Sequence, residues 1–289
     1  MAKIRFITDS GSDLSLEAER EYGIVVIPFP VSFGEKTCLS RVDMTNREFY
    51  GMLEASRELP THSQITVYQY TKLFEEAFAD GVEDVINTTI NAEGSGTYNS
   101  ACLAAQMFFE ANPQAEGRMR IHNLDGQSYT CAYGYPVEQG ARMAAEGRSA
   151  DEILSFMRDW LQHSVIYFAP FTLKYAAKSG RIPSAAAFVG ELVGLKPIMR
   201  IHDHVIVTDD KVRGEKKAIA LMAQKTAREI QPGTPYMVIY GDHPEDGEVM
   251  AKRLTEELGY PPAGMTEIGP VIAINAGPRV AAVMFHEKA

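Results

Sequence analysis

Apolar and polar positions alternate along the first half of the chain in two ways. Short apolar runs predict strands, and longer stretches with apolar residues three or four positions apart predict helices between them. The expected strands are 3–8, 24–31, 84–90 and 119–124, and the expected helices are 16–22, 47–57, 67–79, 97–111, 129–145 and 150–163. Strands that alternate with helices of this length are typical of βαβ units, so we expect a parallel sheet.

The second half has a different pattern, in which short strands, a hairpin and helices are mixed. We expect a hairpin over 197–207 that turns at Asp203-His204, and two strands within 267–285, broken at Gly277-Pro278. The remaining expected elements are strands 165–169 and 237–240 and helices 173–178, 184–193, 215–230 and 245–258. We therefore expect an α/β protein with two domains, an N-terminal α/β domain over 1–160 and a C-terminal α+β domain with a mixed sheet over 161–289.

Composition narrows the class of protein further. The chain has 289 residues and a formal net charge of −10, with no basic stripe interleaved with aromatic residues, so nucleic acid is not an expected partner. No apolar run reaches the roughly 18 residues that a membrane span needs. The three cysteines lack CxxC spacing, and the chain enters its first strand directly after its first residues, without a signal peptide. We expect a cytoplasmic protein.

The most informative local sequence is the loop at 91–98, between an apolar strand and an amphipathic helix. Gly94 and Gly96 allow close approach of the backbone, while Ser95 and Thr97 carry hydroxyl groups at the expected start of the helix. Such a turn presents unpaired N–H groups and the positive end of the helix dipole, which favours a carboxylate or a phosphate. The alternative is a well-capped helix start without a ligand.

Two other segments carry candidate chemistry. In the loop after the first strand, Asp9 and Asp13 are candidate metal ligands, and Asp9 is a candidate base; the favoured alternative is that Ser12 or Asp13 caps the next helix. In the segment 61–64, His62 is either a ligand contact or an ordinary surface histidine.

The remaining candidates are weaker. His202 and His204 have spacing compatible with a metal, but no third ligand is recognisable, so we expect no metal. The basic segments 178–182 and 211–217 either bind phosphate or an acidic partner, or are a solvated turn and a charged helix start. The nucleotide-binding, nucleophile-elbow and zinc-protease motifs are missing from the sequence. This pattern favours a binding protein over an enzyme, and we expect no cofactor.

Taken together, a set of short segments in fixed order resembles the DegV family of bacterial fatty-acid-binding proteins. The resemblance runs over nearly the whole chain, and it is carried by 7–14, 27–29, 42–45, 48–50, 63–64, 95–98, Asp125, 173–175, 180–182, 196–198, Lys211, 213–214, 268–270 and 277–278. It implies a buried tunnel between two domains that holds a long-chain fatty acid. It also implies presentation of the carboxylate to a separate fatty acid kinase, without catalysis by the chain itself.

The sequence departs from the family where the resemblance places the carboxylate. His62 stands where the family has threonine, Asn91 starts the pair that is Ser-Ser in the family, and Asn275 replaces a histidine. Each replacement can still donate a hydrogen bond. We therefore expect these three side chains to converge on the ligand headgroup, and His62 to replace the histidine missing at 275. The rest of the expected ligand-binding set is Ser63, Ser95, Gly96 and Thr97.

The sequence is also compatible with two other functions. The chain is alternatively a hydrolase or phosphotransferase that uses Asp9 and the 91–97 loop on a small anion. It is alternatively a regulatory module that docks a partner through a basic surface. The same basic residues are the expected contacts to a kinase in the carrier interpretation: Lys211, Arg213, Lys216 and Lys217.

Overall fold

The computed structural model describes residues 3–182 and 194–288, and it divides the chain into two compact units. Unit 1 comprises Met1–Phe29 and Ser63–Gln162, and unit 2 comprises Pro30–His62 and His163–Ala289. The chain passes between the two units at 29/30, 62/63 and 162/163, and the predicted boundary at 160/161 lies near the third of these points. A single boundary is nevertheless not what the structure has, because residues 30–62 leave unit 1 and fold with unit 2. The expected helix 184–193 lies outside the described residues.

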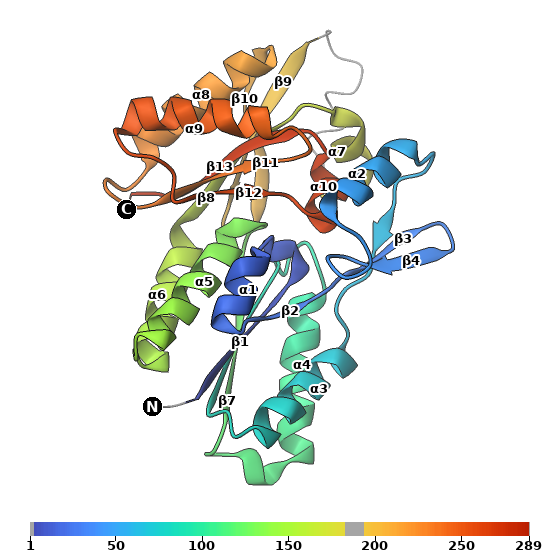
Figure 1. Cartoon of the computed structure of the whole chain (residues 1–289), viewed down its shortest axis with the longest axis vertical. Coiled ribbons are helices and arrows are strands. Elements are labelled where there is room, and N and C mark those ends of the chain that lie inside the picture. Colours follow the sequence, from blue (N-terminus) through green and yellow to red (C-terminus); the bar gives the residue numbers. More distant parts are fainter. Residues whose placement is uncertain (1–2, 183–193, 289) are drawn as a thin grey trace. The chain divides into compact units, whose positions relative to one another are not determined.

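Unit 1 contains the predicted parallel sheet, with strand order β2-β1-β6-β7 (Figure 1). Its strands are β1 (Ile4–Asp9), β2 (Val25–Ile27), β6 (Asp84–Thr89) and β7 (Arg120–Asp125). All six residues of β6 are buried, as expected for a central strand covered on both faces. α1 packs on α5, and α3 packs on α4. The helical segments are η1 (Ser10–Ser12), α1 (Leu16–Tyr22), α3 (Val67–Ala79), α4 (Thr97–Ala111), η2 (Pro113–Ala115), α5 (Cys131–Ala145) and α6 (Ala150–His163).

Unit 2 is built on a six-stranded mixed sheet with the order β10-β9-β8-β13-β11-β12, as the pattern of the second half predicts. β11 and β12 are parallel and the other neighbours are antiparallel. The strands are β8 (Ser164–Pro170), β9 (Leu195–His202), β10 (Val205–Arg213), β11 (Tyr236–Tyr240), β12 (Gly264–Glu267) and β13 (Val280–His286). α8 (Glu215–Glu229) and α9 (Pro244–Leu258) pack on this sheet, and their apolar residues share one buried cluster with those of β8, β11 and β13.

Residues 30–62 form a small antiparallel sheet and a helix within unit 2. The sheet has the order β4-β3-β5, made of β3 (Pro30–Phe33), β4 (Lys36–Leu39) and β5 (Thr61–His62), and the helix is α2 (Asn46–Ala55). A capping box at Thr45 and Glu48 begins α2. The Tyr50 hydroxyl donates to the Ile268 carbonyl oxygen at 2.5 Å, which ties this segment to the C-terminal part of unit 2.

Three local predictions were wrong. The expected strand 24–31 is two strands in two sheets, because Pro28 and Pro30 lack N–H groups for a continuous ladder. Within 267–285 the first expected strand is absent: β12 ends at Glu267, and α10 (Pro270–Ala276) is a helix that begins at a proline, so β13 is the one strand that follows. The cap of α1 is Ser15, whose side chain accepts from the Ala18 N–H, rather than Ser12 or Asp13.

The predicted hairpin is present as β9 and β10. Its turn is at Asp203 and His204, both with positive φ, as a tight two-residue hairpin turn requires. α7 (Leu173–Ser179) follows β8. No helix within residues 3–182 and 194–288 is long and apolar enough to cross a membrane.

Candidate functional site

The 91–97 loop follows the carboxyl end of β6 and is fixed by side chains of unit 1. Asn91 is buried; its Oδ1 accepts from the Glu93 N–H at 3.0 Å and its Nδ2 donates to the Tyr129 hydroxyl at 3.2 Å. The Asp125 carboxylate accepts from the Ala92 N–H at 3.0 Å. These bonds give the loop a defined shape before α4 begins.

The end of the loop gathers hydroxyl groups at the start of α4. The Ser95 and Thr97 hydroxyls are 2.9 Å apart, and the Thr97 N–H donates to Ser95 Oγ at 3.3 Å. Thr97 Oγ1 also accepts from the Ile65 N–H at 3.3 Å. The first N–H groups of a helix lack partners inside it, and α4 has 15 residues, so this end can bind an anion.

The end of the Gln64 side chain lies against Gly96. A Cβ built at position 96 would be 2.1 Å from Gln64 Oε1, well inside contact distance. Gln64 Nε2 donates to Ser100 Oγ at 3.0 Å, one turn into α4. Gln64 and Ser100 therefore belong to this polar group. The polar segment 61–64 and the resemblance both pointed to Gln64, but neither pointed to Ser100. The spacing of Ser100, three residues after Thr97, is the signal that could have found it.

The other expected site residues belong to different elements. Ser63 is exposed and starts the second segment of unit 1. In unit 2, His62 pairs with Val31 in the small sheet, and Asn275 lies on α10 with Nδ2 donating to the Val271 carbonyl oxygen at 2.8 Å. The structure thus brings Ser95, Gly96 and Thr97 together beside Asn91. Convergence of His62 and Asn275 on the same ligand stays a prediction.

The protonation state of His62 follows from its surroundings. Burial lowers the pKa of its imidazole, and the positive charge of Arg181 lowers it further. His62 is therefore neutral at pH 7 and can donate one hydrogen bond there, but it carries a charge only in acid.

Asp9, the candidate base, is fully buried at the end of β1 with both carboxylate oxygens in use. Oδ1 accepts from the Tyr133 hydroxyl at 2.6 Å and from the Gly11 N–H at 3.0 Å, and Oδ2 accepts from the Ile90 N–H at 2.8 Å. Burial raises its pKa to about 6, against the opposing effect of these donors. Because Ile90 directly precedes the 91–97 loop, this carboxylate positions the start of that loop.

Comparison of the sequence with models of known protein families identifies the family of this chain. The sequence model of the DegV family matches residues 3–288. The chain belongs to the DegV family.

Two curated DegV relatives show how far the similarity extends. A DegV domain-containing protein of Clostridium perfringens is 30% identical over 287 residues, covering 99% of each chain. One from Staphylococcus aureus is 31% identical over 281 residues, covering 95% of this chain and 94% of its own.

Solved structures of similar proteins have the same fold. A stearic-acid-binding protein from Eubacterium ventriosum has a TM-score of 0.87 at 25% identity, covering 99% of this chain and 98% of its own. A DegV family protein from Thermus thermophilus, described by its fatty acid binding, has a TM-score of 0.86 at 25% identity, covering 99% of this chain and all of its own.

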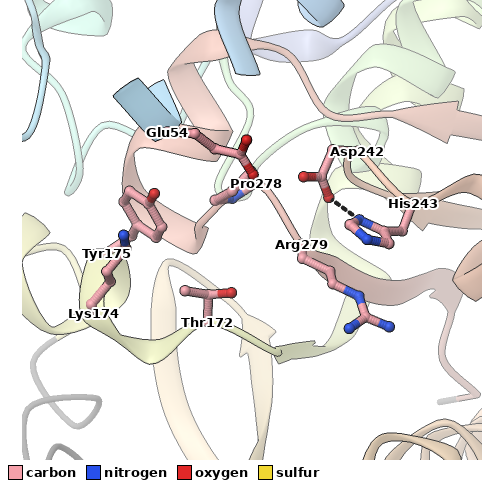
Figure 2. A pocket seen from close by; sticks show the side chains of 8 residues that line it. All are labelled: Glu54, Thr172, Lys174, Tyr175, Asp242, His243, Pro278 and Arg279. Atoms are coloured by element: carbon pink, nitrogen blue, oxygen red, sulfur yellow. Dashed lines mark hydrogen bonds and ion pairs between the residues drawn. The ribbon is translucent and has the colours of Figure 1, made fainter. Parts of the chain in front are cut away.

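This DegV chain has a further concave feature within unit 2. A pocket of about 340 Å³ is lined by Glu54, Thr172, Lys174, Tyr175, Asp242, His243, Pro278 and Arg279 (Figure 2). Its lining is mostly charged or hydroxyl-bearing, which is unsuited to an acyl chain.

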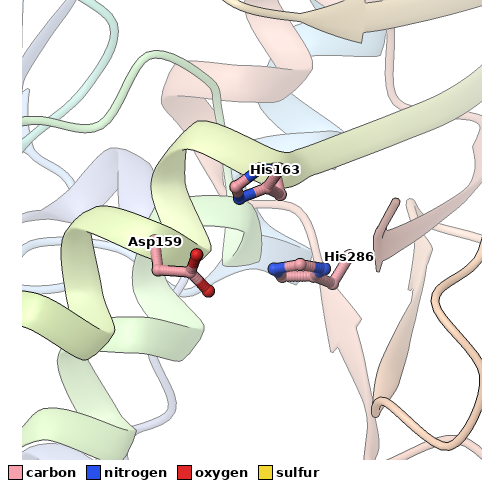
Figure 3. A group of neighbouring side chains, drawn as sticks. All are labelled: Asp159, His163 and His286. Atoms are coloured by element: carbon pink, nitrogen blue, oxygen red, sulfur yellow. The ribbon is translucent and has the colours of Figure 1, made fainter. Parts of the chain in front are cut away.

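Two histidines of unit 2 lie side by side, His163 just before β8 and His286 at the end of β13 (Figure 3). The rings of His163 and His286 stack with centroids 5.0 Å apart. Asp159 lies one turn before His163 on α6, but it belongs to unit 1. The two stacked imidazoles offer two of the three or four protein ligands that a typical zinc site has.

Proposed function

We propose that this DegV chain binds a long-chain fatty acid and seats its carboxylate on the 91–97 loop at the start of α4. The observation that carries the proposal is the pair of Ser95 and Thr97 hydroxyls at the first turn of α4, where the N–H groups of a helix have no partner inside it. A buried carboxylate is stable only with such donors. Family membership and the two fatty-acid-binding relatives at 25% identity support the choice of ligand.

The acyl chain supplies most of the binding energy in this proposal. Burial of a methylene group contributes about 0.8 kcal/mol, so a sixteen-carbon chain contributes roughly 10 kcal/mol before the costs of ordering are subtracted. The polar loop then sets the orientation of the ligand. The chain acts as a carrier and does no chemistry on the fatty acid.

The experiment is extraction of the protein purified from cells, followed by mass spectrometry of the organic phase. Fatty acid in stoichiometric amount is the expected result, and it also identifies the chain length. A protein that is empty after purification and takes up no added palmitate would overturn the proposal and favour a small anion as the ligand.

We also propose that His62, Ser63 and Asn275 contact the headgroup. His62 gains a favourable charge toward a carboxylate when it is protonated, and its pKa is lowered below 6.5. Palmitate affinity is therefore expected to increase as the pH falls below 6.5. Titrations between pH 5.5 and 8 measure this effect.

Single variants distinguish the contributions of His62 and Asn275 to palmitate affinity in that titration. His62→Ala is expected to give a flat profile over this range, whereas Asn275→Ala is expected to bind more weakly at every pH and keep the pH dependence. Unchanged affinity in both variants would contradict the assignment of these residues to the headgroup.

We also propose that the chain presents its bound fatty acid to a fatty acid kinase. Lys211, Arg213, Lys216 and Lys217 are exposed at the end of β10 and the start of α8, while Glu215 between them pairs with Lys196 and Arg279. The segment therefore presents four basic groups whose neighbouring carboxylate is already neutralised. Such a surface fits an acidic face of the fatty acid kinase.

The double variant Arg213→Ala/Lys216→Ala is expected to weaken association with a fatty acid kinase at least about tenfold without loss of bound palmitate. The matched control is Lys252→Ala/Arg253→Ala, which removes two exposed charges from α9. Equal binding of kinase by the two double variants, measured by surface plasmon resonance, would exclude this surface.

A further inference from the structure

The unit 2 pocket lies at the carboxyl ends of β8 and β11, which run in the same direction on either side of the antiparallel strand β13. Thr172 follows β8, Asp242 and His243 follow β11, and Arg279 directly precedes β13, which is hydrogen-bonded between those two strands. Glu54 of α2 and Lys174 of α7 complete the polar lining.

The charges in this pocket are arranged by sign. In Figure 2 the carboxylates of Glu54 and Asp242 lie in the upper part of the view, and Lys174, Thr172 and Arg279 lie in the lower part. A simple anion would be repelled by the two carboxylates, and a simple cation by the lysine and the arginine. The arrangement fits a ligand with one charge of each sign.

Some of these charges are already balanced by the protein. The Arg279 guanidinium is bound to Asp246 at 2.9 Å and to Glu215 at 2.9 Å. One Asp242 oxygen lies 2.5 Å from His243 Nδ1. These contacts fix the walls of the pocket and leave less charge there for a ligand.

Lys174 and Glu54 differ from Arg279 and Asp242, since neither Lys174 nor Glu54 forms an ion pair with any residue in the described part of the chain. The ammonium of Lys174 is held 4.6 Å from the centre of the Tyr175 ring. Thr172 precedes α7, yet within the described segment its side chain makes no capping hydrogen bond, so its hydroxyl is available to a ligand.

We propose that this pocket binds a small zwitterion of the α-amino acid class. The ligand carboxylate is bound by Lys174 and Thr172, and its ammonium group by Glu54 and the Asp242 oxygen that faces away from His243. The volume of about 340 Å³ is at the small end of ligand pockets, which suits a molecule of this size.

The test uses L-serine, L-glutamate and L-lysine as probes in ligand-observed NMR titrations of the whole chain. At least one probe is expected to bind saturably, and its methyl ester and its N-acetyl derivative are each expected to bind about tenfold more weakly or worse. Absence of saturable binding for all three probes would overturn the proposal. Equal binding of the ester would do the same, because it would show a site for cations alone.

Paired variants locate the site. Lys174→Met and Glu54→Gln are each expected to reduce probe affinity about tenfold, while the neighbouring exposed controls Lys178→Met and Glu58→Gln leave it unchanged. Probe binding that survives both pocket variants would place it elsewhere and refute the assignment. Bound fatty acid is measured in the same samples and is expected to be unaffected, so failure here is distinguishable from failure of the carrier function.

Discussion

Replacing Asp9 by alanine is expected to lower the free energy of unfolding by about 3 to 5 kcal/mol at pH 5. The substitution removes the acceptor of three donors, the Tyr133 hydroxyl and the Gly11 and Ile90 N–H groups, from a position with no exposed surface. Buried donors without a partner lose their hydration and gain nothing in return. The start of the 91–97 loop is expected to lose its order as well.

The size of this effect depends on pH. The pKa of Asp9 is raised from 3.8 to about 6 in the folded protein, so the folded state holds the proton more tightly than the unfolded state. The contribution of the group to stability is therefore complete below the unfolded pKa and is lost as the pH rises through about 6. The difference between wild type and Asp9→Ala is expected to be about 1 kcal/mol larger at pH 5 than at pH 7.5.

Urea unfolding at the two pH values, followed by circular dichroism, measures both effects. Tyr133→Phe removes one donor and is expected to cost less than Asp9→Ala, while Asp151→Ala, whose side chain is 81% exposed, is expected to change stability by less than about 1 kcal/mol. A loss in Asp9→Ala no greater than in Asp151→Ala would contradict the role assigned to this carboxylate.

Replacing Gly241 by alanine is expected to destabilise unit 2 by about 3 kcal/mol or more. A Cβ at this position would lie 1.7 Å from the carbonyl oxygen of Pro278, a backbone atom that cannot rotate away. The same two segments are joined by hydrogen bonds from the Gly241 N–H to the Val280 oxygen at 3.2 Å and from the Asp242 N–H to the Pro278 oxygen at 2.8 Å. Relief of the clash would therefore break the contact between the end of β11 and the start of β13.

Gly51→Ala is the matched control, because it lies on α2 in the same unit and an added Cβ meets nothing within 4 Å. That substitution is expected to be neutral or to stabilise by about 0.5 to 1 kcal/mol, since alanine is the better helix former. Equal urea midpoints for Gly241→Ala and the wild type would show that the two backbones can separate at little cost. Amino acid binding in Gly241→Ala is expected to fall as well, because Asp242 and Pro278 line the pocket.

Local sequence patterns predicted the helices and strands well where interactions between residues close in sequence determine them. The apolar run of β6, the helical spacing in α4 and the Asp203-His204 turn all report interactions between residues close in sequence. The parallel sheet of unit 1 was predicted from the alternating order of strands and helices along the first half of the chain. The polar loop before α4 could be found for the same reason, because its glycines and hydroxyls act on the adjacent helix start.

The same patterns were wrong where long-range packing decided. The segment that forms α10 is apolar on nearly all sides, so its period could not separate a buried strand from a buried helix. Residues 30–62 have ordinary strand and helix patterns of their own, and only their contacts assign them to unit 2. A pattern along the chain contains no information about which distant surface covers it.

The candidate sites also divide into features that the sequence determines and features that depend on the tertiary structure. The sequence by itself determined the family, the two-part α/β organisation and the hydroxyl-rich loop at 91–97, since these follow from motifs and adjacent residues. Only the tertiary structure decided that Asp9 is bound by Tyr133, 124 residues away, and that Glu54 and Lys174 line one pocket. The physical reason is that pKa shifts, close backbone contacts and pockets arise when burial brings distant segments together, and burial is a property of the folded chain.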